Sequence, residues 1–337
     1  MYSARLFLSL KLRFEDRRHL GNKNKRVLFC ISLGLHYLCI AMSKSEVKKK
    51  HRFMRLLAGL PLGALYLISD LAYPILYYIV RYRRRLVRKN LCCSFPEKSQ
   101  KEILRIEKAY YHHMCDVFIE SFKCLNISDE EMRQRVEVLN YELPERIAGE
   151  GKNVFMLTGH CGCWEWAQEI SVRYKNPKIT CEIYRQIRSP YFSSLMHEVR
   201  SRWNTVQIEM KQTVRTLLKM KAMGEPFSCG FLIDQRPSTR VLDHLTFMNQ
   251  DTMFVPGAEE IAKKANAELV YLDVEKTSRG HYRLTFREMI VPDDLKDRNY
   301  PFTELYFRML EKTIRRQPEI WLWSHNRWRK FKTRFSS

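Results

Sequence analysis

The chain contains the stretch Asn153-Val-Phe-Met-Leu-Thr-Gly-His-Cys-Gly-Cys-Trp-Glu165, in which a short apolar run leads into two glycines, a histidine and a carboxylate. A run of this length that ends at a glycine is typical of a strand in an α/β sheet. The pattern places His160 at the carboxyl end of that strand and Glu165 in the first turn of the following helix. Open α/β sheets carry their active sites at this edge.

Beyond residue 90 the alternation of short apolar runs with helical patterns continues, and it predicts an α/β fold with a mostly parallel central sheet flanked by helices. The predicted strands are Val154–Thr158, Thr180–Tyr184, Thr205–Ile208, Gly230–Ile233, Leu269–Val274 and Tyr282–Phe286. The predicted helices are Glu102–Phe122, Trp164–Tyr174, Tyr191–Arg202, Val214–Met223, Ala258–Ala265 and Thr303–Arg315. Because no repeat and no linker rich in Pro, Gly or Ser interrupts this region, residues 91–337 are expected to form one catalytic domain.

The composition is that of a globular protein with a sizeable core. The 337 residues are 45% hydrophobic and 12% aromatic, with only 12 Gly and 12 Pro, which excludes long disordered and collagen-like chains. Ten cysteines lie mostly inside apolar runs without paired spacing. This usage is typical of buried free thiols in a reducing compartment, so we expect no disulfides.

Positive charge is concentrated at the N-terminus. Of the formal net charge of +22, residues 1–90 carry +16, from 20 Lys and Arg against 4 acids. Within this part, Met54–Val80 is apolar except for Arg55 and Asp70, and basic clusters flank it on both sides. Such flanks favour a helical segment at the cytoplasmic face of an anionic membrane. Residues 42–90 are therefore predicted to associate with anionic membrane lipid.

The sequence does not determine how deeply that segment enters the bilayer. Met54–Val80 is long enough to span a bilayer, but Pro61, Gly63 and Pro74 interrupt it, so a re-entrant or interfacial helix pair is equally compatible. Residues 1–41 have the basic, patchy composition of an upstream extension. Since Met42 is an equally good start, we expect this extension to be dispensable.

The basic flanks are also compatible with an ordinary solvated face or with a nucleic-acid surface, since tyrosines 77, 78 and 82 alternate with arginines. Neither of these accounts for the long apolar run that lies between the charges, whereas a membrane does. We therefore expect no nucleic-acid partner.

The histidine after the first strand is the candidate general base. His160 can take the proton of an acceptor hydroxyl, and Glu165 is the candidate group that fixes its tautomer and stabilises the imidazolium, as in hydrolytic triads. Gly159 and Gly162 would let the backbone approach a substrate closely, so Gly162 is a candidate substrate contact.

Two charged residues at predicted strand ends are further candidates for substrate binding. Arg185 can stabilise an oxyanion or hold a phosphate, unless it is simply a surface arginine. Asp234 would point into the same crevice, unless it makes a structural ion pair with Arg236 or Arg185.

Other chemistries lack their signatures. The sequence has no G-x-S-x-G, G-x-x-x-x-G-K-[ST], G-x-G-x-x-G or H-E-x-x-H motif, which disfavours a covalent serine mechanism. Cys161 and Cys163 have no second pair of zinc ligands. A further cluster with helical, metal-like spacing consists of His112, His113, Asp116 and Glu120. It lacks the facing Glu-x-x-His motif that such metal sites use. We expect neither a metal nor a cofactor.

The motif around His160 has a known counterpart. Thr158 to Glu165 resembles the T-x-H-x-G-N-W-E block of the lipid A biosynthesis acyltransferases, the lauroyl/myristoyl branch of the lysophospholipid acyltransferase superfamily, with Cys163 in place of Asn. Other blocks follow in the family's order: RRRLVRKNLCCSFP at 83–96, YR at 184–185, IDQRP at 233–237 and PEIWLWSHNRW at 318–328.

The resemblance implies an O-acyltransferase of lipopolysaccharide biosynthesis. It would move a fatty acyl chain from acyl carrier protein to a hydroxyl of a lipid A precursor at the cytoplasmic face of the inner membrane. The family's catalytic positions match His160 and Glu165, and its charged substrate contacts match Arg185 and Asp234. The alternatives are a membrane-associated lipid hydrolase and an acyltransferase acting on another lysolipid or an aminolipid.

Overall fold

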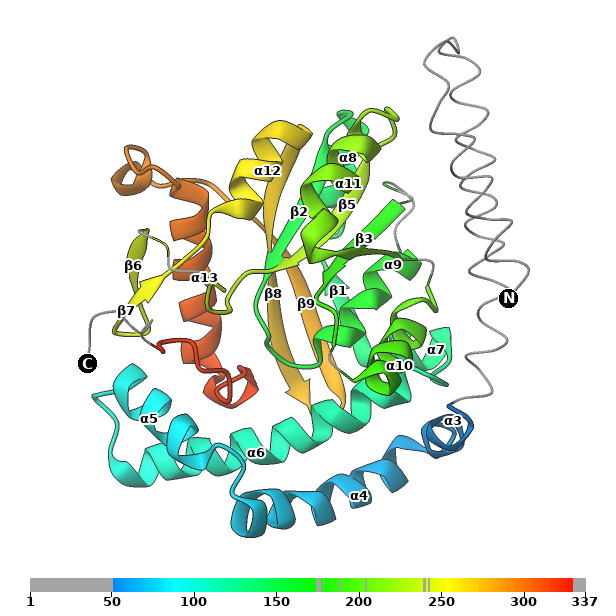
Figure 1. Cartoon of the computed structure of the whole chain (residues 1–337), viewed down its shortest axis with the longest axis vertical. Helices are drawn as coiled ribbons and strands as arrows, with labels where there is room; N and C mark the ends of the chain where they lie inside the picture. The colour runs from blue at the N-terminus through cyan, green and yellow to red at the C-terminus, as the bar shows by residue number, and fades with distance from the viewer. Residues whose placement is uncertain are drawn as a thin grey trace. The chain divides into compact units, whose positions relative to one another are not determined.

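A seven-stranded sheet forms the centre of the protein, with the strand order β1-β9-β8-β2-β5-β3-β4 (Figure 1). Its strands are β1 (Val136–Leu139), β2 (Asn153–Thr158), β3 (Ile179–Tyr184), β4 (Val206–Glu209), β5 (Phe227–Leu232), β8 (Ala267–Ser278) and β9 (His281–Glu288). Neighbouring strands are parallel except β8 and β9, which form an antiparallel hairpin. The predicted α/β fold with a mostly parallel sheet is confirmed.

The structure is a computed structural model, and it describes residues 51–329 except 174–176, 178, 188, 204, 239–240 and 242. From Phe53 onward the chain forms one compact unit. The predicted extension at 1–41 lies outside the described residues, as do residues 42–50 of the predicted membrane segment.

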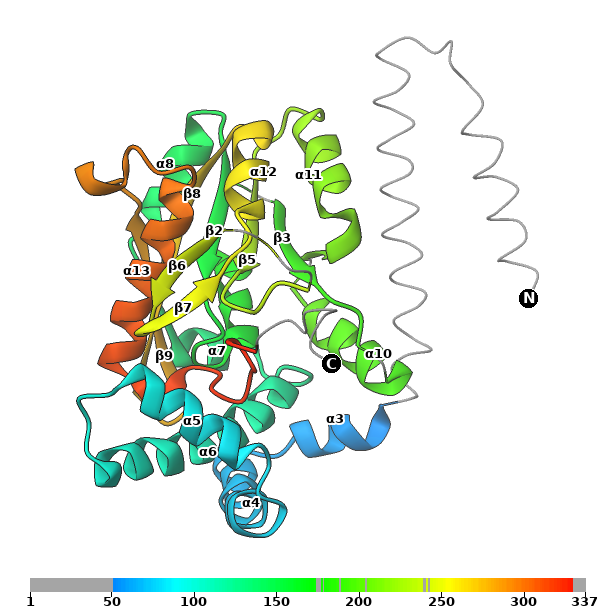
Figure 2. The same cartoon turned by 60° about the vertical axis from the view of Figure 1, so that its left-hand side comes forward.

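Helices cover both faces and one end of the sheet (Figures 1 and 2). The longer helices are α4 (Leu62–Pro74), α5 (Arg84–Ser94), α6 (Gln100–Lys123), α10 (Pro190–Arg200), α11 (Thr213–Lys221), α12 (Gly257–Ala265) and α13 (Pro301–Arg316). Shorter ones are α3 (Arg52–Ala58), α7 (Asp129–Arg135), α8 (Glu142–Gly149) and α9 (Glu169–Arg173). A π-helical turn, η1 (Ile75–Val80), continues α4, and 3-10 turns form η2 (Trp164–Gln168), η3 (Met210–Gln212), η4 (Asp293–Leu295) and η5 (Pro318–Ile320).

The elements that the sequence did not reveal are short. They are β1, α7, α8 and the two-stranded hairpin of β6 (His244–Phe247) with β7 (Gln250–Met253). The four-residue strand β1 pairs with β9, which lies far along the chain, so its pairing leaves no local periodicity. The helix predicted at 164–174 starts as the 3-10 turn η2 and becomes α-helical only in α9.

The central strand β2 leads directly into Gly159. All six side chains of the strand are buried, as expected for an apolar strand between two parallel neighbours, β8 and β5. At Gly159 a Cβ atom would lie 2.7 Å from Cδ1 of Leu310 in α13. A larger residue there would force the side chain of Leu310 to move, and the chain turns away from the sheet at this point.

Helices α3 to α6 lie across the end of the sheet at which β8 terminates (Figures 1 and 2). The N-terminus of α6 is fixed by a capping box between Ser99 and Glu102. The side chain of Tyr282, at the start of β9, donates a 2.6 Å hydrogen bond to Glu120 of α6. The apolar helix α4 packs along α6. The predicted membrane segment is therefore attached, through α6, to the sheet end that follows β8.

Candidate active site

His160 and Asp234 form the centre of the site because their strands are paired. Thr158 of β2 lies opposite Leu232 of β5 in a parallel register, so the residues two positions further on emerge side by side. Nδ1 of His160 is 2.7 Å from Oδ1 of Asp234, and the backbone N–H of His160 donates to Oδ2 at 3.0 Å. One carboxylate thus holds both the ring and the backbone of the histidine.

Trp321 completes the support of this carboxylate. Its indole N–H donates to Oδ2 of Asp234 at 2.8 Å, and its backbone bridges to Cys161 next to the histidine. Burial raises the pKa of Asp234, but the charge and hydrogen bonds of His160 and the indole of Trp321 outweigh this effect and lower it to about 2. Asp234 is therefore an anion at neutral pH, and it accepts the Nδ1–H of His160.

The second ring nitrogen of His160 faces an exposed side chain. With the proton on Nδ1, the lone pair of Nε2 is an acceptor. The amide nitrogen of Gln235, an exposed side chain, lies 3.1 Å from Nε2. A surface amide is easily displaced, so a substrate hydroxyl can take the same position and donate to Nε2.

The orienting carboxylate predicted from the sequence is wrong: Asp234, not Glu165, contacts Nδ1 of His160. Glu165 is buried and accepts two hydrogen bonds from Arg200 of α10, at 2.6 and 3.0 Å. It also accepts the indole N–H of Trp164 at 3.2 Å, and the Trp164 ring packs edge-on against His160 with ring centroids 5.1 Å apart. Glu165 therefore reaches the histidine only through Trp164, because η2 turns its side chain toward α10.

The other predicted contacts occupy different surroundings. Gly162 has a positive φ of 59°, and its N–H donates to the carbonyl of Ile320, while a Cβ there would lie 2.9 Å from the ring of Tyr282. Its role in this structure is a tight turn. Arg185 follows β3, is exposed, and has no hydrogen bond or ion pair with a described residue. Asp234 makes neither of the ion pairs with Arg236 or Arg185 that the sequence left open.

The closing segment of the chain supports the site from the side of α5. Nε2 of His325 accepts the backbone N–H of Arg236, and desolvation lowers the pKa of His325 to about 4, so its ring is a neutral acceptor. The buried Asn90 of α5 donates to the carbonyls of Trp323 and His325. The contact of Trp321 with Asp234 was not predicted, although both residues stand in motifs that the sequence singled out.

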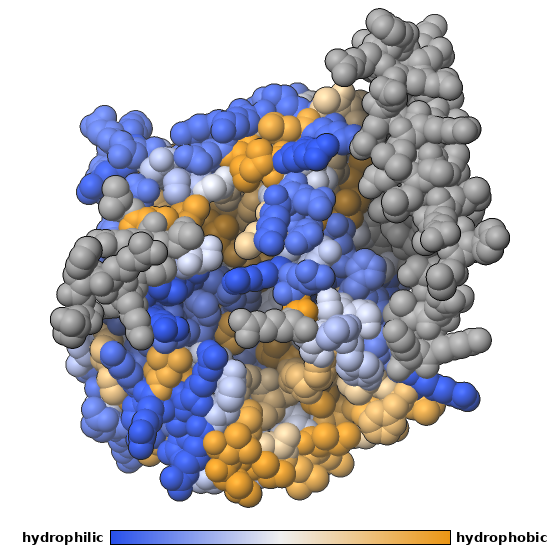
Figure 3. All heavy atoms as spheres, viewed as in Figure 1, coloured by the Kyte–Doolittle hydropathy of each residue, from blue (hydrophilic) through white to orange (hydrophobic). Residues whose placement is uncertain are grey.

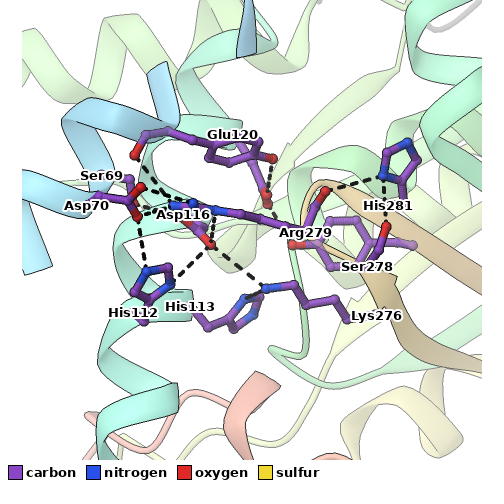
Figure 4. Close-up of polar contacts among 12 residues, drawn as sticks. Ser69, Asp70, His112, His113, Asp116, Glu120, Lys276, Ser278, Arg279 and His281 are labelled. Atoms are coloured by element: carbon purple, nitrogen blue, oxygen red, sulfur yellow. Dashed lines mark hydrogen bonds and ion pairs between the residues drawn. The ribbon is translucent and has the colours of Figure 1, made fainter. Parts of the chain in front are cut away.

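The cluster with metal-like spacing is a closed polar network (Figure 4). Arg279, from the β8–β9 turn, donates to Asp116 of α6 and to Asp70 of α4, each with a shortest distance of 2.6 Å. His112 lies between the same two carboxylates, 3.0 Å from Asp70 and 3.6 Å from Asp116. The guanidinium of Arg279 therefore lies between the two carboxylates where a metal would bind, and no group of three potential ligands with metal-binding geometry occurs in the described part of the chain.

An apolar surface extends along the outer side of α3, α4 and η1 (Figure 3). Its exposed side chains are Phe53, Leu56, Leu60, Leu67, Ile68, Leu71, Ile75, Ile79 and Val80. We call this set the apolar face. By length and composition Leu62–Val80 is one helical stretch capable of crossing a membrane. Next to it lie the exposed side chains of Arg81, Arg83, Arg85 and Lys89.

Comparison with known proteins agrees with the motifs. Residues 51–330 match the model of the family described as bacterial lipid A biosynthesis acyltransferase. Over 291 residues the chain is 23% identical to lipid A biosynthesis lauroyltransferase of Escherichia coli strain K12, and the alignment covers 82% of this chain and 92% of that relative. The resemblance that the sequence motifs indicated is thereby confirmed.

Proposed function

Since the chain belongs to the bacterial lipid A biosynthesis acyltransferase family, we propose that it transfers a fatty acyl chain from an acyl carrier protein thioester to a hydroxyl of a lipid A precursor, with His160 as general base. The observation that carries this proposal is the geometry of His160. Asp234 holds its Nδ1–H, and its Nε2 faces an exposed, displaceable amide.

The chemical step follows from this arrangement. The acceptor hydroxyl donates to Nε2 of His160, and as its oxygen bonds to the thioester carbonyl carbon, the proton moves to Nε2. Asp234 stabilises the resulting imidazolium. Collapse of the tetrahedral intermediate breaks the C–S bond, and the proton on Nε2 passes to the departing thiolate. Every proton removed is returned, so no cofactor is required.

Two residues are proposed to act on the substrates. Arg185 lies exposed after β3, next to β5, where a guanidinium can bind a phosphate of the acceptor or the oxyanion. Gly162 is proposed to shape the substrate site by keeping the turn after His160 narrow, since it is itself buried and its N–H donates to Ile320. Glu165 is proposed to position His160 through Trp164.

The test is a product analysis with a radiolabelled acyl carrier protein donor, with and without a phosphorylated lipid A precursor. We expect labelled acceptor to exceed free fatty acid, because acceptor and thioester must be ordered together for the base to act. Free acid as the main product in the presence of acceptor would favour the lipid hydrolase. Transfer only to another lysolipid or to an aminolipid would retain the mechanism and change the substrate.

We also propose that the enzyme lies on the cytoplasmic face of the inner membrane with α4 in the plane of the bilayer. The inward side of this helix is tied to the body: Tyr66 donates to Glu120 at 2.8 Å, and Ser69 to Asp116 at 2.7 Å. A transmembrane orientation would break these bonds and expose polar groups to hydrocarbon, which costs several kcal/mol for each unsatisfied group. An in-plane helix keeps them and buries only the apolar face.

Charge next to the apolar face supports the same placement. Arg81, Arg85 and Lys89 are exposed beside it and can attract anionic lipid and an acidic carrier protein. The test is co-sedimentation with phosphatidylglycerol vesicles. Leu71→Glu, at a side chain 70% exposed on α4, is expected to reduce binding, whereas Ile290→Glu, at one 74% exposed outside the apolar face, is not. Equal effects of the two changes would contradict the placement.

A further inference from the structure

A cavity of about 90 Å³ lies against one face of the sheet, next to the turn that carries His160. Its lining includes Gly159 and Cys161, which flank the histidine in the sequence, and Trp164, whose ring packs against it. Apolar side chains from four strands line much of the remainder, among them Met156, Leu232, Leu272, Val274 and Leu284. By the usual requirement of about 10–15 Å³ for each water, the space is large enough for several small groups, such as a segment of an acyl chain.

One lining residue does not fit a purely apolar cavity. Gln168, at the end of η2, is only 6% exposed, and neither its amide oxygen nor its amide nitrogen has a hydrogen-bond partner among the described residues. A buried amide left in this way costs about 1–3 kcal/mol. In contrast, the hydroxyls of Thr180, Ser171 and Thr205, which also line the cavity, are bonded to one another at 3.0 and 3.2 Å.

A second unsatisfied polar group lines the same cavity. Oε1 of Glu182 in β3 is buried without a hydrogen bond, and its nearest cation is Nε of Arg200 at 3.8 Å. Burial raises the pKa of Glu182 to about 8, and its Oε1 is free to accept a hydrogen bond from a group in the cavity. The cavity therefore contains both an apolar lining and unused donors and acceptors.

We propose that the cavity receives the acyl chain of the donor, and that Gln168 makes it selective for a chain that carries a hydroxyl group. This inference rests on the proposed acyl transfer. We assign the chain to the donor because the thioester carbonyl must lie within reach of the hydroxyl at Nε2 of His160, and the cavity adjoins the turn that carries this histidine. A hydroxyl fits because it donates to an amide oxygen and accepts from an amide nitrogen, the two kinds of atom that Gln168 leaves unpaired.

The test is a competition between two acyl carrier protein donors of equal length, one saturated and one hydroxylated at carbon 2 or 3, with the full-length enzyme and a lipid A precursor. Mass spectrometry gives the product ratio. The wild type is expected to favour the hydroxyacyl donor by at least about tenfold, the effect of one buried hydrogen bond. Gln168→Leu, of similar size, is expected to abolish or reverse the preference without loss of the saturated product.

A control change at an exposed amide, Gln212→Leu in η3, is expected to leave the ratio unchanged. An unchanged ratio in Gln168→Leu, or a wild type that prefers the saturated donor, would overturn the inference and indicate that water satisfies the amide. Because replacing an unpaired buried amide by an apolar group is neutral or stabilising, Gln168→Leu is also expected to keep or raise Tm.

A binding measurement separates this inference from the proposed function. The shift in Tm of the wild type is measured with a free hydroxylated fatty acid and, separately, with the saturated acid of equal length. A larger shift with the hydroxylated acid, lost in Gln168→Leu, supports the role of Gln168 even if no transfer to a lipid A precursor is found. Equal shifts in both proteins would reject it even if transfer is active.

Discussion

Two histidine clusters at the same end of the fold have opposite properties. In the active site, His160 is held at Nδ1 by Asp234 and faces an exposed amide at Nε2. In the network between α4, α6 and the β8–β9 turn, both ring nitrogens of His112 face carboxylates, and Arg279 bridges those same carboxylates (Figure 4). The first cluster leaves one nitrogen for a substrate, whereas in the second both ring nitrogens of His112 are directed at carboxylates of the protein.

The difference indicates which histidine can act as a general base. A base needs one oriented nitrogen and one accessible nitrogen, and His160 has both. His112 binds two elements together: its carboxylate partners belong to α4 and α6, so its contacts hold the apolar helix against the body. Sequence spacing alone drew attention to both clusters, and only the set of partners separates them.

The largest expected effect comes from substitutions in the His160–Asp234 pair. His160→Ala and Asp234→Asn are each expected to lower the rate of acyl transfer by about 10²- to 10⁴-fold, the first by removing the base and the second by losing its tautomer and charge support. The measurement is kcat in the donor assay on variants whose Tm shows that they are folded. Near-normal turnover in a folded Asp234→Asn variant would show that this carboxylate is not the orienting group.

Substitutions in the network around Arg279 and Asp116 should lower the stability of the protein without lowering the rate of acyl transfer. Arg279→Met leaves Asp116, which is fully buried, with Lys276 at 3.9 Å as the nearest cation among the described residues. We expect the free energy of unfolding to fall by about 2–3 kcal/mol, below the range for a fully buried pair because Arg279 is one-third exposed. Urea denaturation gives this value. A loss of kcat in the remaining folded enzyme as large as that of Asp234→Asn would contradict the division of roles.

Glu165→Gln tests a residue that forms a buried ion pair but also reaches His160 through Trp164. The amide oxygen can still accept from Trp164, but the charge that binds Arg200 is lost. We expect roughly a tenfold decrease in kcat or less, consistent with an indirect contact to the base. If this variant were as inactive as Asp234→Asn, Glu165 would have to contact the reacting groups directly.

Substitution of His325 is expected to have the smallest effect, which is a change in how the stability of the protein depends on pH. Its pKa is about 4 in the folded protein against an ordinary value of 6.5, so between these pH values the unfolded chain binds a proton that the folded chain does not. Stability is therefore expected to fall as the pH decreases from 6.5 to 4. In His325→Asn, whose side-chain oxygen can still accept from Arg236, this part of the decrease should disappear in urea midpoints measured at pH 7, 5 and 4. An unchanged pH dependence would mean that His325 does not titrate in this way.

Much of the fold was predictable because its signals are local. The six predicted strands and the helices at 102–122, 258–265 and 303–315 correspond to observed elements, since burial on a strand or on one side of a helix leaves a short-range pattern. The strand β1 and the hairpin β6–β7 left none. The sequence singled out both His160 and Asp234, but it did not reveal the hydrogen bond between them.

By itself, the sequence determined that a histidine follows a central strand, that the N-terminal part is basic and apolar, and which family the motifs resemble. Composition and short-range spacing are sufficient for these conclusions. The tertiary structure decided the partner of His160, because the parallel register of β2 and β5 brings Asp234, 74 residues away, closer to it than Glu165, five residues away. It also decided that the polar side of α4 faces α6, because hydrogen bonds between segments distant in sequence fix that orientation.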